Sequence, residues 1–451
     1  MKPHLILINP WIYDFAAYDF WSKPLGLLAI AGFLRNKGFL IHLIDCLDIH
    51  HPGMPGSRAL IRLARRAYGT GKFFRERVPK PAALNNIPRS YSRYGMSKQC
   101  FIEELKAVER PSAILVTSLM TYWYPGVLEA VRAAKEIHPR TPVLLGGIYA
   151  KLCTDHALRI SEADEVVTSL NLLDFSALPD ILQRFGIKAI PAPNPPHPYP
   201  AFDLLHGIDY VCLQTSLGCP FRCRYCASPF LNPRILKKDP LQILEEIFYW
   251  NTNWGVKDYA FYDDALLMEF DSHLKVLLEK VMKQNRLMRF HTPNALHVRK
   301  ITSSVAKLLY ASGFQTIRLG LETSDMGLHL ALDGKVSPGE FEKAVKNLAG
   351  AGFSKKEIGV YILAGLPDQS PESVEESVRY VDKAGATPYL AEYSPIPHTP
   401  LWRRALACSE YDLAAEPLYQ NNTLLPCWNP DQRKRFADIK KEVIEIRRRS
   451  D

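Results

Sequence analysis

Strand and helix patterns alternate along most of this chain and are interrupted by one proline-rich segment. Before it, an apolar strand at 5–9, a helix at 24–37 and a second strand at 40–45 form a βαβ opening. After it, short apolar strands and amphipathic helices alternate from 210 to 393. Six of the ten residues 191–200 are prolines, which interrupt both helices and sheet ladders. The pattern therefore predicts two parallel-sheet domains joined at this segment.

We expect an α/β protein with a doubly wound, Rossmann-like sheet first and a full or partial (β/α) barrel second. Both architectures place ligands at the carboxyl ends of their parallel strands. The 451 residues suit two such domains, because a barrel alone takes ~250 residues. The predicted boundaries are a Rossmann-like domain at 1–190 with a basic insertion at about 55–100, a proline-rich linker at 191–204, a barrel at 205–400 and a helical extension at 401–451.

Composition places the chain among ordinary globular proteins, with 47% hydrophobic and 23% charged residues. The apolar run at 25–34 is far shorter than the ~20 residues of a membrane span. The N-terminus also has no apolar stretch of signal-peptide length. We therefore expect a cytoplasmic protein with no membrane partner, whose nine cysteines are free thiols or metal ligands.

Positive charge is concentrated in one segment of the first predicted domain. Residues 58–98 hold eleven Lys and Arg and a single acidic residue, Glu76, while the whole chain carries a net charge of +9. Such a segment can attract an anionic substrate or a nucleic acid. It can equally form a solvated cover, and the sequence leaves the two interpretations open.

The most informative motif is the cysteine cluster Cys219, Cys223 and Cys226, which follows a predicted strand directly. Iron–sulfur clusters are held by thiolates, usually four, so three on one loop would leave one iron of a [4Fe–4S] cube open. Zinc is the alternative, but structural zinc sites need four ligands and commonly a second Cys-x-x-Cys pair. This chain has no such second pair. The spacing therefore favours an iron–sulfur site with an open position for chemistry.

With its Cys-x3-Cys-x-aromatic-Cys spacing, the chain resembles the radical S-adenosylmethionine (radical SAM) superfamily, Tyr225 being the aromatic residue. The resemblance extends over residues 205 to 400 in the order expected along the barrel. Its further motifs are Tyr262-Asp263-Asp264, Gly320-Leu321-Glu322, Gly365-Leu366-Pro367 and the segment Ser394 to Leu401.

The resemblance implies that Cys219, Cys223 and Cys226 hold a [4Fe–4S] cluster and that SAM chelates the open iron. It also implies reductive cleavage of SAM to methionine and a 5′-deoxyadenosyl radical, with an electron donor such as flavodoxin or ferredoxin. Carboxylates suit the SAM ammonium and ribose hydroxyls, and glycines let backbone approach the nucleoside. The residues expected at the cofactors are therefore Tyr225, Asp263, Asp264, Gly320, Glu322, Gly365 and Pro367.

Residues 1 to about 185 resemble the cobalamin-binding domain that precedes the barrel in one branch of the superfamily. The resemblance makes cobalamin a candidate third cofactor. Where that family often has Gly-Glu-Gly-Glu, this chain has Thr168-Ser169-Leu170-Asn171. The residues expected near cobalamin are Thr117, Ser118, Gly146 and Gly147, which follow predicted strands.

One histidine motif resembles a cobalt-binding pattern but is misplaced. Asp48-Ile49-His50-His51-Pro52-Gly53 fits Asp-x-His-x-x-Gly, yet it follows the second strand, whereas the family motif follows the first. We therefore expect His50 to be a loop residue and not a cobalt ligand.

Three functions follow from these observations. The leading one is a cobalamin-dependent radical SAM methyltransferase acting on an unactivated centre. Its substrate is unidentified, and the basic segment makes an anion a candidate. In the second, the first domain is a scaffold without cobalamin. The third is an RNA-modifying enzyme of the methylthiotransferase type. Such enzymes carry a second three-cysteine cluster and an RNA-binding domain, and the sequence indicates neither, so a nucleic-acid partner is not favoured.

Overall fold

The computed structural model describes residues 2–54, 65–190, 197–284 and 286–449. Backbone contacts divide the chain into two compact units. Unit 1 runs to Asp209 and includes Glu416–Leu418, and unit 2 begins at Tyr210 and takes in the rest. Part of the predicted proline-rich linker lies outside the described residues, and the domain boundaries drawn from the sequence stay predictions.

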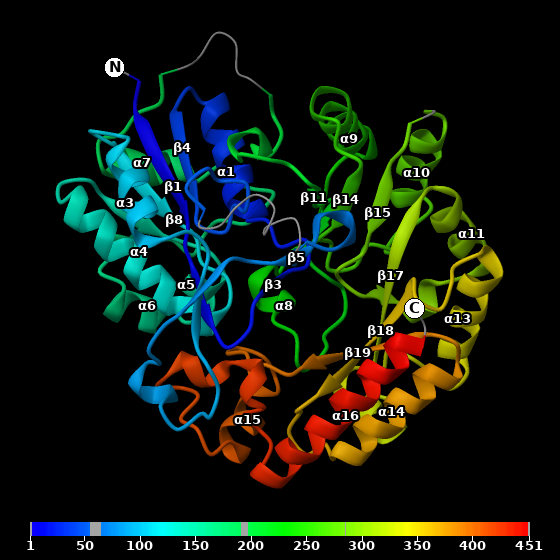
Figure 1. Ribbon diagram of the computed structural model, residues 1–451. Helices are drawn as coiled ribbons and strands as arrows, with labels where there is room; N and C mark the ends of the chain where they lie inside the picture. The colour runs from blue at the N-terminus through cyan, green and yellow to red at the C-terminus, as the bar shows by residue number, and fades with distance from the viewer. Residues whose placement is uncertain (1, 55–64, 191–196, 285, 450–451) are drawn as a thin grey trace. The chain divides into compact units, whose positions relative to one another are not determined.

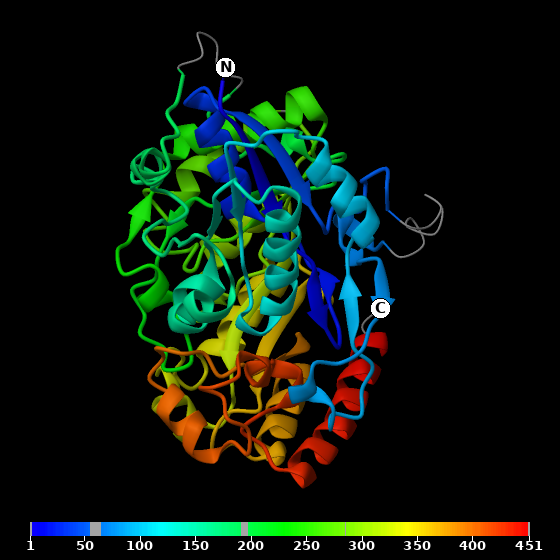
Figure 2. The same cartoon turned by 90° about the vertical axis from the view of Figure 1, so that its left-hand side faces the viewer.

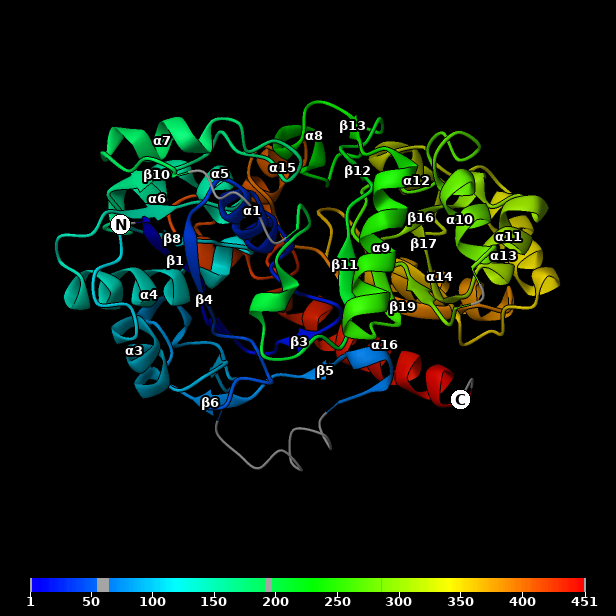
Figure 3. The same ribbon diagram turned by 90° about the horizontal axis from the view of Figure 1, so that it is seen from above.

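Unit 1 contains the predicted doubly wound sheet (Figure 1), with five parallel strands in the order β10-β9-β8-β1-β4. The apolar side chains of β1 are fully buried, as expected for a strand covered on both faces. Helix α1 lies on one side of the sheet, and α3 and α4 lie on the other (Figure 3). The bounds are β1 (His4–Asn9), α1 (Leu25–Asn36), β4 (Leu40–Asp45), α3 (Lys98–Lys106), β8 (Ala113–Val116), α4 (Tyr124–Ile137), β9 (Val143–Leu145), α5 (Ile148–Leu152), α6 (Thr154–Ile160), β10 (Glu165–Val166) and α7 (Leu178–Arg184).

The described part of the basic segment forms small antiparallel sheets within unit 1. Strands β2 (Ile12–Asp14), β7 (Ser92–Tyr94) and β6 (Arg75–Arg77) pair in one sheet, and β3 (Tyr18–Asp19) pairs with β5 (Gly71–Lys72). Residues 58–64 of the segment lie outside the described residues.

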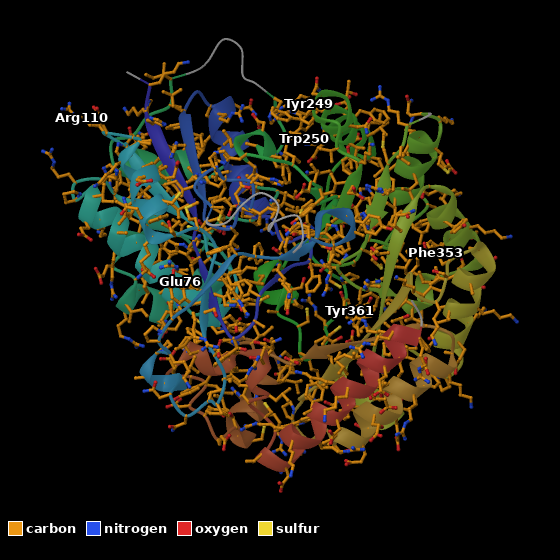
Figure 4. The ribbon with its side chains drawn as sticks, in the orientation of Figure 1. Glu76, Arg110, Tyr249, Trp250, Phe353 and Tyr361 are labelled. Atoms are coloured by element: carbon orange, nitrogen blue, oxygen red, sulfur yellow. The ribbon has the colours of Figure 1, made fainter. Side chains whose placement is uncertain are left out.

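Two arginines of this segment are neutralised inside the unit. Buried Arg93 pairs with Glu76, which Figure 4 labels, and Arg65 donates to Asp19 at 2.7 Å. An ion pair of this kind neutralises the positive charge that would otherwise attract an external anion. These contacts favour a structural role for at least this part of the segment.

The loop after β4, which contains the histidine motif, is tied to the last residues of unit 1. Asp48 Oδ2 accepts hydrogen bonds from the backbone N–H of His206 (2.9 Å) and lies 3.1 Å from its Nδ1. His50 Nε2 lies 2.9 Å from Asp209 Oδ2. Because its ring is engaged by a carboxylate, His50 has a local structural partner, in line with its expected role as a loop residue.

The Asp48–His206 pair makes the stability of unit 1 depend on pH. Burial alone would raise the pKa of Asp48, but hydrogen bonds from His206 and the charge of Lys23 lower it to about 2 from the usual 3.8. A carboxyl with a lowered folded-state pKa contributes stability above about pH 4, and this contribution is lost as the pH falls toward 2. We expect Asp48→Asn to lower the free energy of unfolding by about 2 kcal/mol at pH 6.

Urea unfolding between pH 2.5 and 6 measures this contribution as the difference between wild type and variant. The difference is expected to shrink toward the acid end, since wild type loses the pair there. Asp155→Asn on the exposed side of α6 is the matched control and should leave stability unchanged. A difference that stays constant over this range would contradict the assignment.

Unit 2 is the predicted partial barrel. Six parallel strands follow one another in the order β11-β14-β15-β17-β18-β19, with β16 beside β17 and with helices along the outside (Figure 1). The bounds are β11 (Val211–Leu213), α9 (Pro240–Trp254), β14 (Asp258–Phe261), α10 (Leu274–Met282), β15 (Arg289–His291), β16 (Leu296–His297), α11 (Ser303–Ala311), β17 (Phe314–Glu322), α12 (Met326–Leu332), α13 (Glu340–Ala351), β18 (Ile358–Ala364), α14 (Pro371–Lys383), β19 (Thr387–Glu392) and α15 (Trp402–Cys408).

The apolar run at 210–217 reads as one strand in the sequence, but it forms two short strands. After β11, the chain turns at Gln214 and Thr215, and β12 (Ser216–Leu217) pairs antiparallel with β13 (Leu236–Lys237). The carboxylate of Asp263 accepts hydrogen bonds from the backbone N–H groups of Thr215 and Ser216, which fixes the turn. An apolar run by itself cannot reveal this break, because the partner acid lies far away in the sequence.

The predicted C-terminal helix is α16 (Pro430–Arg449), red in Figures 1 and 2. It packs on α14 and β19 of unit 2 through Phe436, Ile439, Val443 and Ile446, which are buried. Among the described helices, none is both long enough and apolar enough to cross a membrane.

Candidate active site

The three cysteines lie on one loop of unit 2 and line a single cavity. The loop leaves β12 at Gly218 and ends at α8 (Ser228–Leu231). Gly218 has a φ of +86°, and a Cβ there would lie 2.6 Å from the carbonyl oxygen of Arg234, so only glycine fits. Cys219, Cys223 and Cys226 all line the cavity, whose volume is about 250 Å³.

The thiols have the chemistry expected of cluster ligands. Burial raises the pKa of all three, that of Cys223 to about 11, so a positively charged metal centre is needed to deprotonate them. No three His, Cys, Asp or Glu side chains of the described residues are arranged to hold a single metal ion. Thiolates that each bind a different iron of a cube do not have to converge on one position. The three cysteine thiols therefore fit a cluster and not a single metal ion.

Glu322 and Lys335 form a charged group at the wall of the same cavity. Lys335 Nζ lies 3.0 Å from Asp333 Oδ2 and 3.5 Å from Glu322 Oε1, and it donates to the hydroxyl of Tyr225 at 2.9 Å. Burial lowers the pKa of Lys335, but the surrounding negative charges outweigh it and hold the pKa above its usual value. Lys335 is therefore a permanent cation beside the cysteine loop.

The two adjacent aspartates after β14 have different environments. Asp264 lines the cavity and accepts a hydrogen bond from Ser228 Oγ at 2.7 Å. Asp263 is 2% exposed and is not among the residues that line the cavity. Its oxygens accept from Thr215 Oγ1 and Ser216 Oγ, both at 2.6 Å, as well as from the two backbone N–H groups. These bonds saturate the carboxylate of Asp263, so we leave it out of the proposed SAM contacts.

Of the predicted glycine and proline residues, one lines the cavity and two do not. Gly320 lines the cavity, where a Cβ would come within 2.9 Å of Glu322 Oε1. Gly365 and Pro367 follow β18 and do not line it. The backbone N–H of Gly365 donates to Gln369 Oε1 at 3.0 Å, which closes the loop on itself.

In unit 1 the four residues expected near cobalamin lie together at the carboxyl ends of β8 and β9. Ser118 Oγ donates to the carbonyl oxygen of Gly146 at 2.6 Å. Gly147 has a φ of +96°, and a Cβ there would lie 2.2 Å from the carbonyl oxygen of Ser118. Thr117 follows β8 directly. The close approach of these two strand ends by itself accounts for a glycine at 147.

Lys335 and His297 also line the cavity, although the sequence did not place them among the cofactor contacts. Lys335 lies in the connection between α12 and α13. This connection does not follow a strand, and the sequence analysis expected ligands only at strand ends. His297 ends β16 and stacks on Phe221 of the cysteine loop with ring centroids 4.3 Å apart. Both nitrogens of His297 are buried with no hydrogen-bond partner among the described residues, and burial together with nearby cations lowers its pKa to about 4. The sequence signal that could have indicated His297 as a cavity residue is its position at the end of a barrel strand.

A family model of the radical SAM superfamily matches residues 213–381, which include the cysteine loop and the strands that surround the cavity. Residues 213–381 therefore form a radical SAM domain. The superfamily implies a [4Fe–4S] cluster and SAM as cofactors, and the cavity with its three thiols fits this pair.

Sequence relatives include several methyltransferases. An uncharacterized methyltransferase of Pyrococcus horikoshii is 25% identical over 66% of this chain and 70% of that protein. The hopanoid C-2 methylase of Rhodopseudomonas palustris is 27% identical over 46% of this chain and 40% of that protein.

Solved structures extend the fold likeness to both units. The radical SAM methyltransferase TsrM from Kitasatospora setae, solved with cobalamin and a [4Fe–4S] cluster, matches 91% of this chain and 80% of that one with a TM-score of 0.64 at 14% identity. The cobalamin-dependent radical SAM enzyme OxsB matches 93% of this chain and 57% of that one with a TM-score of 0.55 at 11% identity. At these identities the likeness is one of fold. It confirms a doubly wound α/β domain followed by a partial (β/α) barrel.

Proposed function

We propose that this radical SAM enzyme is a cobalamin-dependent methyltransferase that acts on an unactivated centre. The observation that carries the proposal is the combination on one chain of the three-thiol cavity with a doubly wound sheet, a chain whose fold is similar to that of TsrM, which was solved with cobalamin. The methyltransferases among the sequence relatives support the same class of reaction.

Within unit 2 the cavity residues have separable tasks. Cys219, Cys223 and Cys226 would each hold one iron of a [4Fe–4S] cluster. When bound, that cluster supplies the electron that cleaves SAM to methionine and a 5′-deoxyadenosyl radical. A carboxylate such as Asp264 or Glu322 suits the ammonium or ribose hydroxyls of SAM, and the cationic Lys335 suits its carboxylate. The electron donor we expect is a flavodoxin or ferredoxin.

The adjacent aspartates allow stability and cofactor binding to be tested apart. The carboxylate of Asp263 accepts hydrogen bonds from the hydroxyls of Thr215 and Ser216. Asp263→Asn places an amide N–H₂ group against these donors, and we expect it to lower the free energy of unfolding by about 2 kcal/mol. Asp264→Asn should leave stability unchanged and weaken SAM binding roughly tenfold, the loss expected for one charge-assisted hydrogen bond.

Urea unfolding and equilibrium dialysis of SAM on the iron-reconstituted enzyme measure the two effects. Normal stability of Asp263→Asn combined with weakened SAM binding would show that Asp263 contacts the cofactor after all. Each variant serves as the matched control for the other, because the two residues are adjacent on one strand end.

The proposed function is tested by anaerobic expression with cobalamin uptake, followed by reconstitution with iron and sulfide. We expect about four irons per chain, corrinoid absorbance bands, and methyl transfer that depends on the corrinoid. Iron and SAM cleavage without any affinity for corrinoid would overturn the cobalamin part of the proposal.

That outcome would instead support the second candidate, in which unit 1 is a scaffold. The specific observation in its favour is Gly147, whose close contact with Ser118 needs no ligand to explain it. An absolute requirement for corrinoid in substrate turnover would exclude the scaffold function.

A further inference from the structure

The inner face of the last three barrel strands bears an unusual set of side chains. Gly320 of β17 is in register with Tyr361 of β18, which is in register with Tyr389 of β19; Tyr361 is labelled in Figure 4. Arg318 precedes Gly320 by two residues and therefore lies on the same face, about 7 Å along the strand. The face that carries Arg318 thus continues into Gly320, which lines the cysteine cavity.

The guanidinium of Arg318 is held in place without a carboxylate partner. It lies across Gly359, where a Cβ would come within 2.7 Å of Nη1, and stacks on Tyr389 with its central carbon 4.4 Å from the ring centroid. Nη1 donates to the carbonyl oxygen of Ile317 at 2.9 Å, and Nη2 lies 3.4 Å from the Tyr389 hydroxyl. Within the described residues, Arg318 forms no ion pair.

A second guanidinium contacts the same aromatic ring. Arg447 of α16 lies 4.3 Å from the ring centroid of Tyr389, and it too has no ion pair in the described part of the chain. Both arginines are partly buried. Removing cations from water without pairing them is costly, and two like charges on one ring add repulsion. An anion at this position would relieve both costs.

We propose that Arg318, Tyr389 and Arg447 bind an anionic oxygen group of the substrate, a carboxylate or a phosphate. The inference rests on the proposed function, since it assigns the substrate class of the same barrel. A guanidinium presents a planar fork of N–H donors that matches either group, and stacking on an aromatic ring fixes its orientation. A small molecule anchored at Arg318 would reach the level of Gly320 within about 7 Å, so its anionic group lies near the reacting atom.

The test uses the full-length, iron-reconstituted enzyme with inorganic phosphate and succinate as probes. Isothermal titration is carried out at constant ionic strength with sodium chloride as the balancing salt. We expect phosphate or succinate to bind wild type, Arg318→Gln to weaken that binding roughly tenfold or more, and Arg318→Lys to restore part of it. Arg447→Gln should weaken it less, and Arg132→Gln, which changes an exposed side chain of α4, is the matched control that should leave it unchanged.

The outcomes separate the proposal from its alternatives. Binding of phosphate alone identifies a phosphorylated substrate class, and binding of succinate alone identifies a carboxylated one. No binding of either probe to wild type, or equal binding to wild type and Arg318→Gln, would overturn the site. Formation of 5′-deoxyadenosine from SAM without substrate is measured in parallel on wild type and on the control Arg132→Gln, and should be the same in both. Its absence in wild type would count against the proposed function, while the anion titration would still report on Arg318 independently.

Discussion

Replacing Cys223 by alanine is expected to abolish both cluster assembly and SAM cleavage. With three thiols on one loop, each alanine removes one of only three protein ligands, and a cube held by two thiolates is not retained. Iron content should fall from about four per chain to near zero, and 5′-deoxyadenosine should no longer form. Iron analysis, the absorption spectrum and product chromatography measure these effects.

The matched control is Cys408→Ala, which removes an exposed thiol of the same unit. It should keep the iron content and SAM cleavage of wild type. Because Cys223 is buried, its variant is also compared with wild type by urea unfolding before reconstitution. Full iron occupancy in Cys223→Ala would contradict the assignment of the loop as the cluster site.

Replacing Lys335 by methionine is expected to reduce SAM cleavage by about a hundredfold, chiefly through weaker SAM binding. Lysine and methionine side chains have similar lengths, but the variant leaves Glu322 and Asp333 without the cation that now contacts both. The charge-assisted contact proposed between Lys335 and the SAM carboxylate is worth up to about 3 kcal/mol, which corresponds to a factor of about a hundred in a binding constant. The hydroxyl of Tyr225 loses a donor as well.

Two further variants test the physical cause. Lys300→Met removes another lysine that lines the cavity, but an exposed one, and should have a much smaller effect. Lys335→Arg keeps the charge and should recover part of the SAM affinity. Equal losses in Lys335→Met and Lys300→Met would show that only the overall charge of the cavity matters.

The architecture of both units could be predicted because it depends on local patterns. Apolar strands that alternate with amphipathic helices specify parallel sheets, and the strands at 4–9 and 40–45 agree closely with the predicted ones. The cysteine loop was predictable for a similar reason, since its three cysteines are only a few residues apart. Short sequence spacing guarantees short spatial separation whatever the rest of the fold does.

Sequence reasoning was weaker wherever partners are distant in the chain. The adjacent residues Asp263 and Asp264 look equivalent in the sequence, yet one is saturated by the turn at Thr215 and the other lines the cavity. Lys335 was missed because its connection approaches Tyr225 from over one hundred residues away. Which side chains meet there depends on the curvature and register of the barrel strands, and no local pattern encodes these.

The sequence by itself thus determined the two-sheet architecture, the loop that carries the three proposed cluster cysteines, and the radical SAM motif, because each depends on short-range spacing and periodicity. Only the tertiary structure decided which carboxylate faces the cavity, which lysine neutralises it, and that Arg318 lies without an ion-pair partner among the described residues. Those features arise when segments far apart in the chain pack together. Burial and charge then act on groups whose neighbours the sequence does not name.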